Sequence, residues 1–305
     1  MNYVQLYQAI QDYAETNEPL FVANIPRFVQ EAEDRIYNSV QLPSLRKNVT
    51  GTMTNGNKYL SLPNDWLATY SLALVVNGSY EYLLNKDVNY IRQAFPNPSD
   101  TGTPTHYALF GSQYTLTNEL SLIMGPTPDD NYTAELHYFY YPPTIVQGQI
   151  TLMATTTAGT LYVPGTYKEV SLTGGSGSGA IASITVNSSG AVSSVTLQDG
   201  GQFYKVGDTL SALASSLGGA GSGLVLTLTA VSNADGTSWL GDNYDPVLFY
   251  GAMREAMIFQ KQEPDLIKNY EDKYQEAMAQ LKRLGDGLER GDAYRDGQTK
   301  LRVNS

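Results

Sequence analysis

The chain has 305 residues with 30 acidic and 19 basic side chains, a formal net charge of −11, 23 tyrosines and no cysteine. Such a charge argues against a nucleic-acid-binding face, because phosphate contacts need clustered lysines and arginines. Without cysteine, disulfides, thiolate metal ligands and a cysteine nucleophile are excluded. No apolar run reaches about 18 residues, so we expect no span through a membrane. The length suggests two domains, each with its own core.

Two helices are expected near the N-terminus. Apolar side chains recur at helical spacing through residues 3–15, which indicates a short amphipathic helix. A second helix is expected to begin at Pro26, since proline suits the first helical position. Its apolar stripe includes Phe28 and Ile36.

From residue 46 to residue 141 the hydrophobic period is two, which predicts an antiparallel β-domain with one sheet of about six or seven strands. Asn55-Gly56-Asn57 and Asn77-Gly78 each lie between alternating runs, and each predicts a hairpin. Asp87 is expected to cap a short helix that ends at Phe95. Three further strands are expected near residues 106–116, 119–124 and 133–141.

Residues 148–236 separate this β-domain from the C-terminal part of the chain. Half of the 28 glycines lie within residues 151–232, where charged side chains are scarce. The run 174–185 recurs as 218–229, and each copy is a glycine turn that leads into an alternating strand. Such an internal repeat indicates a folded β-module rather than a flexible linker.

After this module the helical period returns. Asp245 and Pro246 are expected to begin one helix, which Pro264 breaks or kinks. A longer helix is expected over residues 265–284, with Gly285 as its C-cap.

The fold class expected from these patterns is α+β. A helical domain would be built from the N- and C-terminal helices, beside an antiparallel β-domain and an inserted small all-β module. A polar C-terminal arm would stay flexible until a partner orders it. The expected boundaries are 1–45 with 237–285 for the helical domain, 46–147 for the β-domain, 148–236 for the module and 286–305 for the arm.

No catalytic constellation emerges from the sequence. His106 and His137 lie in strand patterns, and neither has a second ligand at metal-binding spacing. The glycine turns lack the lysine of a phosphate loop and lead into strands rather than helices. Residues 175–179 are a glycine–serine turn without the nearby histidine that a serine nucleophile needs. We therefore expect a non-enzymatic protein with no metal and no cofactor.

Short motifs follow one another in a fixed order on both sides of the module. They are residues 25–36 (IPRFVQEAEDRI), 62–67 (LPNDWL), 104–108 (PTHYA), 125–129 (GPTPD), 136–143 (LHYFYYPP) and 244–252 (YDPVLFYGA). This succession resembles the head-to-tail adaptor proteins of tailed bacteriophages, of the tail tubular protein A type. In that family the last strand is followed closely by the C-terminal helices. The resemblance thus covers about 1–147 and 237–290, and the module is expected to be an insertion that projects outward.

The resemblance implies a structural connector of a short-tailed phage, present in the neck and tail of the virion and assembled in the host cytoplasm. Its subunits would form a dodecameric ring that binds the portal protein and the tail nozzle protein, and DNA would pass through the lumen during ejection without sequence-specific binding. The module would contact tail fibres or nozzle subunits, and no membrane is implied. The arm residues expected to contact a partner are Tyr294, Arg295, Lys300, Leu301 and Arg302.

Two other functions stay open at this point. A glycan- or surface-binding protein of a virion or cell surface would use aromatic side chains of the module to stack on sugar rings. The candidates are Tyr162, Tyr167, Phe203 and Tyr204, and their burial in the module's own core would instead indicate a structural role. A polysaccharide-degrading enzyme would need an acidic pair in a cleft, and nothing in the sequence singles out such a pair.

Overall fold

The structure is a computed structural model that describes residues 1–97, 99–111 and 120–296, with side chains to residue 287 of the last helix. The described residues form helices and mainly antiparallel sheets, which confirms the α+β class. The chain divides into two compact units. One contains Met1–Val40 and Pro143–Asp286, and the other is built on Gln41–Pro142.

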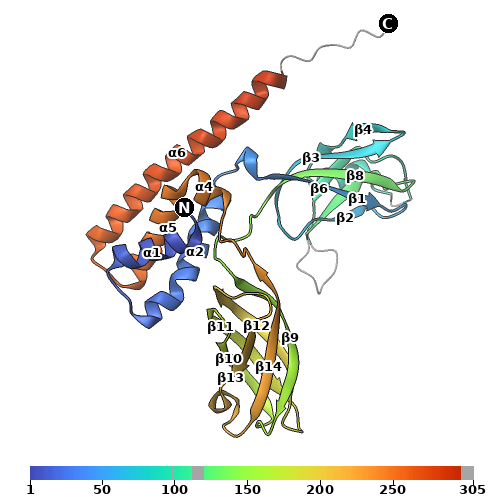
Figure 1. Ribbon diagram of the computed structural model, residues 1–305. Helices are drawn as coiled ribbons and strands as arrows, with labels where there is room; N and C mark the ends of the chain where they lie inside the picture. The colour runs from blue at the N-terminus through green and yellow to red at the C-terminus, as the bar shows by residue number, and fades with distance from the viewer. Residues whose placement is uncertain (98, 112–119, 297–305) are drawn as a thin grey trace. The chain divides into compact units, whose positions relative to one another are not determined.

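The helices of the first unit come from both ends of the chain. They are α1 (Tyr3–Ala14), α2 (Pro19–Ser39), α4 (Trp239–Asn243), α5 (Asp245–Phe259) and α6 (Pro264–Asp296) (Figure 1). Asn2 begins α1 with a capping box, because its side chain accepts from the backbone N–H of Gln5 and the Gln5 side chain accepts from that of Asn2. α2 packs along α5, and their buried stripes include Ile25, Val29 and Leu248.

Ion pairs join three of these helices. The carboxylate of Glu255 in α5 lies 2.7 Å from Arg35 of α2 and 2.7 Å from Arg254. Arg254 also pairs with Glu271 of α6. Because the Glu255 side chain is only 11% exposed, solvent screens its ion pairs less than it screens surface pairs. This network therefore fixes α2 and α6 against α5.

Two expected helix boundaries are wrong. α2 begins at Pro19, so Pro26 lies inside the helix rather than at its start. An interior proline costs about 3 kcal/mol, but the stripe on either side of Pro26 is buried, and this packing outweighs the cost. Gly285 lies inside α6, which runs on to Asp296. One glycine costs only about 1 kcal/mol relative to alanine, so it does not by itself end a helix.

The other expected features of the C-terminal helices are confirmed. α5 begins at Asp245 with Pro246 in its first turn, and the chain breaks between α5 and α6, which begins at Pro264. Residues 286–296, the first part of the expected arm, continue the backbone of α6, whereas residues 297–305 lie outside the described residues.

The second unit is a β-domain of two four-stranded sheets, ordered β1-β8-β3-β4 and β2-β7-β6-β5. Its elements are β1 (Arg46–Met53), β2 (Tyr59–Ser61), β3 (Trp66–Val76), β4 (Ser79–Tyr82), β5 (Leu84–Asn85), α3 (Val88–Ala94), β6 (His106–Leu109), β7 (Ser121–Gly125) and β8 (Tyr132–Tyr140). β5 pairs with β6 in parallel, while the other pairs are antiparallel. The prediction of a single antiparallel sheet is therefore wrong.

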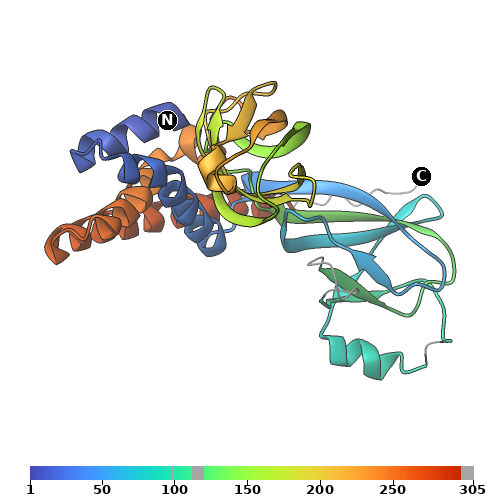
Figure 2. The same cartoon turned by 90° about the horizontal axis from the view of Figure 1, so that it is seen from below.

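The two sheets share an apolar core, and α3 covers the second sheet. Leu74, Leu122 and Leu136 lie in the shared core. Figure 2 shows α3 beside the second sheet, where Ile91 packs with Ala108 and Ile123 in a smaller cluster. Asp87 caps α3 as expected, since its carboxylate accepts from the backbone N–H of Asn89 at 2.7 Å.

The two expected hairpins have different outcomes. Asn77-Gly78 joins β3 to β4, which confirms the hairpin expected there. Asn55-Gly56-Asn57 does not form a hairpin, because β1 pairs with β8 and β2 pairs with β7. This turn instead carries the chain from one sheet to the other. The Asn55 N–H donates to the Asn131 side chain and the Gly56 N–H to the Pro128 carbonyl, so the turn is fixed against the loop before β8.

The glycine-rich module is a six-stranded antiparallel sheet with its own core. Its elements are β9 (Gln149–Thr160), β10 (Gly165–Gly174), β11 (Ser178–Val186), β12 (Val192–Gln202), β13 (Thr209–Ala212) and β14 (Ser222–Ser232), with a short 3-10 turn at Ala214–Leu217. The core contains Ile184, Leu217 and Leu226. The repeated runs become the starts of β11 and β14, which confirms a glycine turn that leads into a strand.

The two halves of the module exchange strands. The sheet order is β12-β11-β10-β13-β14-β9. The first strand of each half therefore pairs with the third strand of the other half, β9 with β14 and β12 with β11, while β10 and β13 meet in the middle. Both halves are needed to complete the sheet, so the module folds as one unit.

Candidate functional site

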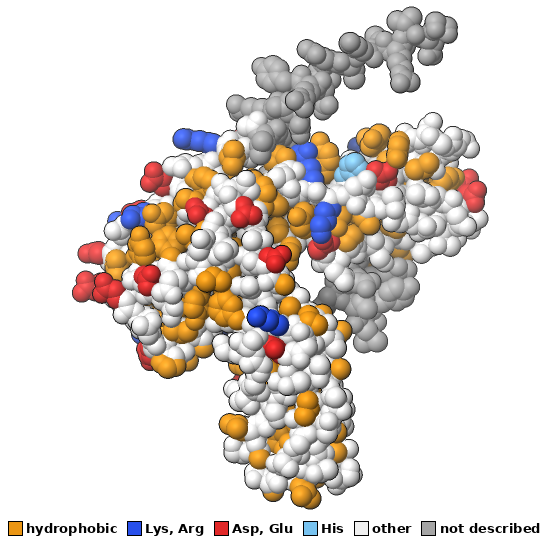
Figure 3. All heavy atoms as spheres, viewed as in Figure 1, with side chains coloured by type: hydrophobic (Ala, Val, Ile, Leu, Met, Phe, Trp, Pro, Cys, Tyr) orange, Lys and Arg blue, Asp and Glu red, His pale blue; other side chains and the backbone are white. Residues whose placement is uncertain are grey.

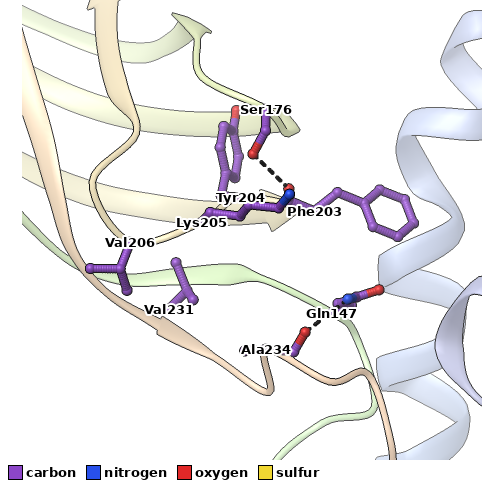
Figure 4. Close-up of a pocket in the computed structure, with 8 residues that line it drawn as sticks. All are labelled: Gln147, Ser176, Phe203, Tyr204, Lys205, Val206, Val231 and Ala234. Atoms are coloured by element: carbon purple, nitrogen blue, oxygen red, sulfur yellow. Dashed lines mark hydrogen bonds between the residues drawn. The ribbon is translucent and has the colours of Figure 1, made fainter.

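A cavity of about 500 Å³ lies at the end of the module that adjoins α1. It is lined by Gln147, Ser176, Phe203, Tyr204, Lys205, Val206, Val231 and Ala234 (Figure 4). Most of these residues lie in loops between the strands of the module. Lys205 is the one charged residue among those lining the cavity.

The polar groups around this cavity bind one another. The carboxylate of Asp208 accepts from the Ser176 hydroxyl at 2.6 Å, the Ser176 N–H at 2.9 Å and the Lys205 N–H at 3.0 Å. The bonds from Ser176, followed by that from Lys205, hold the pKa of Asp208 below its ordinary value. The Gln147 side chain donates to the Ala234 carbonyl at 2.8 Å. These bonds fix the loops and present no paired carboxylates for catalysis.

The aromatic residues considered for sugar stacking are packed within the protein. Tyr162 and Tyr204 are buried in the module core, and the Tyr162 hydroxyl accepts from the Leu224 N–H at 3.2 Å. Tyr167 is half-buried against the same core and donates to the Val163 carbonyl. This burial indicates a structural role. These tyrosines do not form an exposed surface on which sugar rings could stack, which argues against the glycan-binding interpretation.

Phe203 joins the module to α1. Its ring centroid lies 5.4 Å from that of Tyr3 and 5.4 Å from that of Tyr7. The Tyr3 hydroxyl donates to the Gln202 side chain at 2.5 Å, and the Tyr3 N–H donates to the Gly236 carbonyl at 2.7 Å. These contacts fix the N-terminal helix to the end of the module.

The β-domain has an exposed sheet face with a polar network at its centre. The carboxylate of Glu135 in β8 accepts from Asn48 at 2.7 Å, lies 2.9 Å from His137 Nε2 and bonds to the Tyr80 hydroxyl. These bonds, that from His137 first, hold the pKa of Glu135 below its ordinary value. On the edge strand β4, Tyr80 is 56% and Tyr82 68% exposed. Exposed tyrosines beside a fixed polar network are typical of a protein interface.

The motif at residues 62–67 has a structural role beside this face. Asp65 accepts from the Lys47 ammonium at 2.6 Å and from the Tyr138 hydroxyl at 2.9 Å. Its carbonyl accepts from the Tyr141 N–H at 2.8 Å. The motif thus ties the ends of β1, β3 and β8 together.

The described part of the chain offers no group of three or more metal-ligating side chains. The His137 ring is hydrogen-bonded to the Glu135 carboxylate, and the His106 ring is hydrogen-bonded to the Thr105 hydroxyl. None of the helices in the described residues has the length and apolar character needed to cross a membrane.

The family model described as SU10 adaptor protein matches residues 1–175, which is more than half of the chain. The chain belongs to the SU10 adaptor protein family. The match covers α1, α2, the whole β-domain and β9, and extends through the last residue of β10. A comparison of the sequence with curated proteins finds no match.

Family membership makes this chain a bacteriophage structural adaptor. Such a protein contacts other virion components, and its place is the neck and tail of the virion. Phage structural adaptors are typically non-enzymatic. The match does not stop at residue 148, where we expected an insertion to begin, but continues to residue 175. The family match therefore does not mark residue 148 as a boundary, and the insertion of the module into an adaptor core stays a proposal.

The arm residues expected to contact a partner lie at the end of the adaptor's described region or beyond it. Tyr294 and Arg295 belong to the last turns of α6, but their side chains lie outside the described part. Lys300, Leu301 and Arg302 follow the last described residue. Their role in partner contact stays a prediction.

Two features of the adaptor went unnoticed in the sequence. The Glu135-x-His137 spacing places both side chains on one face of a strand, so their pairing could have been predicted from the sequence. Residues 159–162 (GTLY) recur as residues 201–204 (GQFY), and this second repeat extends the duplication beyond the glycine turns. The bonds from Asn48 and Tyr80 could not be read from sequence, because strand order brings these residues together.

Proposed function

We propose that the chain is a head-to-tail adaptor, or connector, of a short-tailed bacteriophage, and that it forms a dodecameric ring between the portal and the tail nozzle. The observation that carries this proposal is the family match over residues 1–175. The order of the six motifs supports the tail tubular protein A type, with the module inserted between the last strand of the β-domain and the C-terminal helices.

Exposed apolar residues supply surfaces for such a ring. A ring subunit needs two different side faces that meet in neighbouring copies. Tyr80 and Tyr82 on β4 provide one surface. The helical part exposes a second set of apolar residues, which consists of Val4, Tyr13, Leu20, Ile258, Phe259 and Leu266. We assign contacts between subunits to these two sets.

The charge of the chain suits a DNA conduit. With a net charge of −11 on each subunit, a lumen built from this chain would repel phosphates, so that DNA could pass during ejection without being held. The arm from residue 286 onward, including Tyr294 and Arg295, is proposed to bind the portal or a neighbouring subunit. The module is proposed to project outward, toward tail fibres or nozzle subunits.

A genetic experiment tests the role of the protein in the virion. A phage with a stop codon early in this reading frame, grown in a host that does not suppress it, should produce DNA-containing heads without attached tails. Infectivity should fall by several orders of magnitude, and the wild-type chain supplied in trans should restore it. Tailed, infectious particles that lack the protein would contradict the adaptor role.

A further inference from the structure

The two halves of the module carry equivalent loops. In the first half, residues 161–164 follow β9, and in the second half, residues 203–206 follow β12. Leu161 and Phe203 occupy the same place in these loops, and both have a left-handed backbone, with φ of 63° and 62°. We call residues 161–164 the free loop and residues 203–206 the covered loop.

The surroundings of the two loops match closely. Tyr162 follows Leu161, its N–H donates to the Gly190 carbonyl at 3.0 Å, and its ring covers Gly221. Tyr204 follows Phe203, its N–H donates to the Gly148 carbonyl at 3.0 Å, and its ring covers Gly177 in the same way. The tyrosine hydroxyls also accept from equivalent backbone N–H groups, those of Leu224 and Ala180. The duplication thus preserves the shape of the loop at both ends of the module.

The two loops differ in what covers them. Tyr3 and Tyr7, four residues apart on one face of α1, pack on the ring of Phe203. Within the described part of the chain, no helix covers Leu161, which is 73% exposed, and Val163 in the same loop is 44% exposed. The amphipathic helix seated on the covered loop therefore shows what kind of element fits this loop shape.

The conformation of Leu161 makes its exposure costly. A bulky residue is strained in the left-handed region, whereas asparagine or glycine adopts this conformation readily. A leucine that is 73% exposed also gains little packing from the described part of the chain in return. Charged residues do not occur within residues 159–166, and Figure 3 shows apolar side chains without charged ones at the far end of the module, on the face in view. The free loop is thus a neutral, apolar knob in a conformation that a polar residue would adopt more easily.

We propose that the free loop docks an amphipathic helix of a partner protein that carries two aromatic side chains four residues apart, as α1 carries Tyr3 and Tyr7. Leu161 is the central contact, and Val163 lies beside it. This inference goes beyond the adaptor function, because it rests on the duplication within the module and not on the ring.

The chain itself supplies the probe for this site. A peptide of residues 1–15 with a fluorophore at its C-terminus is titrated with the full-length protein, and binding is followed by fluorescence anisotropy. We expect saturable binding that Leu161→Asn weakens at least about tenfold, because the variant replaces the apolar side chain at the centre of the contact with a polar one. Leu161→Gly should cause a similar loss, and a peptide with Tyr3→Ala and Tyr7→Ala should not bind.

Matched controls separate docking from folding. Asparagine and glycine both accept the left-handed conformation, so the melting temperature of both Leu161 variants should stay at or above that of the wild type. Leu152→Asn changes another exposed leucine of the module, on β9, and should leave peptide binding unchanged. Absence of saturable binding to the wild type, or equal binding by Leu161→Asn, would overturn the proposal. A self-association that Leu161→Asn abolishes, without peptide binding, would assign the loop to a second copy and would also overturn it.

Discussion

Tyr3→Ala should lower the free energy of unfolding of the first unit by about 4 kcal/mol, the cost expected for truncating a buried aromatic side chain. Tyr3 is fully buried, and its ring packs on Phe203 of the covered loop. The truncation also leaves the buried side chain of Gln202 without its hydrogen-bond donor. We expect α1 to separate from the module before the rest of the unit unfolds. Urea unfolding followed by tyrosine fluorescence, together with hydrogen exchange of α1, measures both effects.

A milder change at the same position provides the control. Tyr3→Phe keeps the ring against Phe203 and removes only the bond to Gln202, so it should cost about 1–2 kcal/mol. Tyr7→Ala removes a ring that is only half-buried and should fall between the two. If the free energy of unfolding of Tyr3→Ala lies within about 1 kcal/mol of that of the wild type, the contacts of Tyr3 do not hold α1 to the module.

The stability of the first unit should fall as pH rises through neutrality because of Glu33. This residue of α2 is buried, and burial raises its pKa from 4.5 to about 7, although it accepts hydrogen bonds from the Thr144 hydroxyl at 2.5 Å and the Ile145 N–H at 2.8 Å. The folded pKa is higher than the unfolded pKa, so the folded state binds the proton more tightly. The resulting stabilisation is fully present below pH 4.5 and is lost as pH rises through about 7.

Glu33→Gln isolates this effect from other titrating groups. Glutamine keeps an oxygen for the Ile145 N–H but does not titrate. The free energy of unfolding of the wild type minus that of Glu33→Gln should therefore fall by roughly 3 kcal/mol between about pH 4 and about pH 8.5. Urea unfolding at a series of pH values measures this difference. A difference that does not change with pH would show that Glu33 does not carry the buried proton.

Local sequence signals predicted local structure well. The capping residue Asp87, the Asn77-Gly78 hairpin and the glycine turns before β11 and β14 depend on residues close together in the chain. The start of α2 and the end of α6 were wrong, because Pro26 and Gly285 are tolerated within helices at a modest cost.

Strand partners were harder to predict than strands. Both β1 and β2 form as strands, as expected, but an alternating sequence pattern does not say which strand lies beside it. Asn55 and Gly56 bond to the loop that contains Asn131 and Pro128, far away in sequence, and this sends β1 and β2 into different sheets. The strand exchange within the module has the same origin, since its pairs cross between the two halves.

The candidate interaction surfaces were only partly visible in the sequence. Abundant tyrosine suggested an interface, and Tyr80 and Tyr82 are indeed exposed on an edge strand. The repeat that contains Leu161 and Phe203 can be read from the sequence. The difference in exposure between these two residues cannot. One loop is covered and the other is free because α1, from the opposite end of the sequence, packs on the second half of the module.

The adaptor assignment is tested most directly by adding the purified full-length chain to its purified portal ring and imaging the product by electron microscopy. We predict a dodecameric ring of this chain seated on one face of the portal, with a mass by sedimentation that matches full occupancy. A chain that stays monomeric beside an unoccupied portal would contradict the proposal that it connects head and tail.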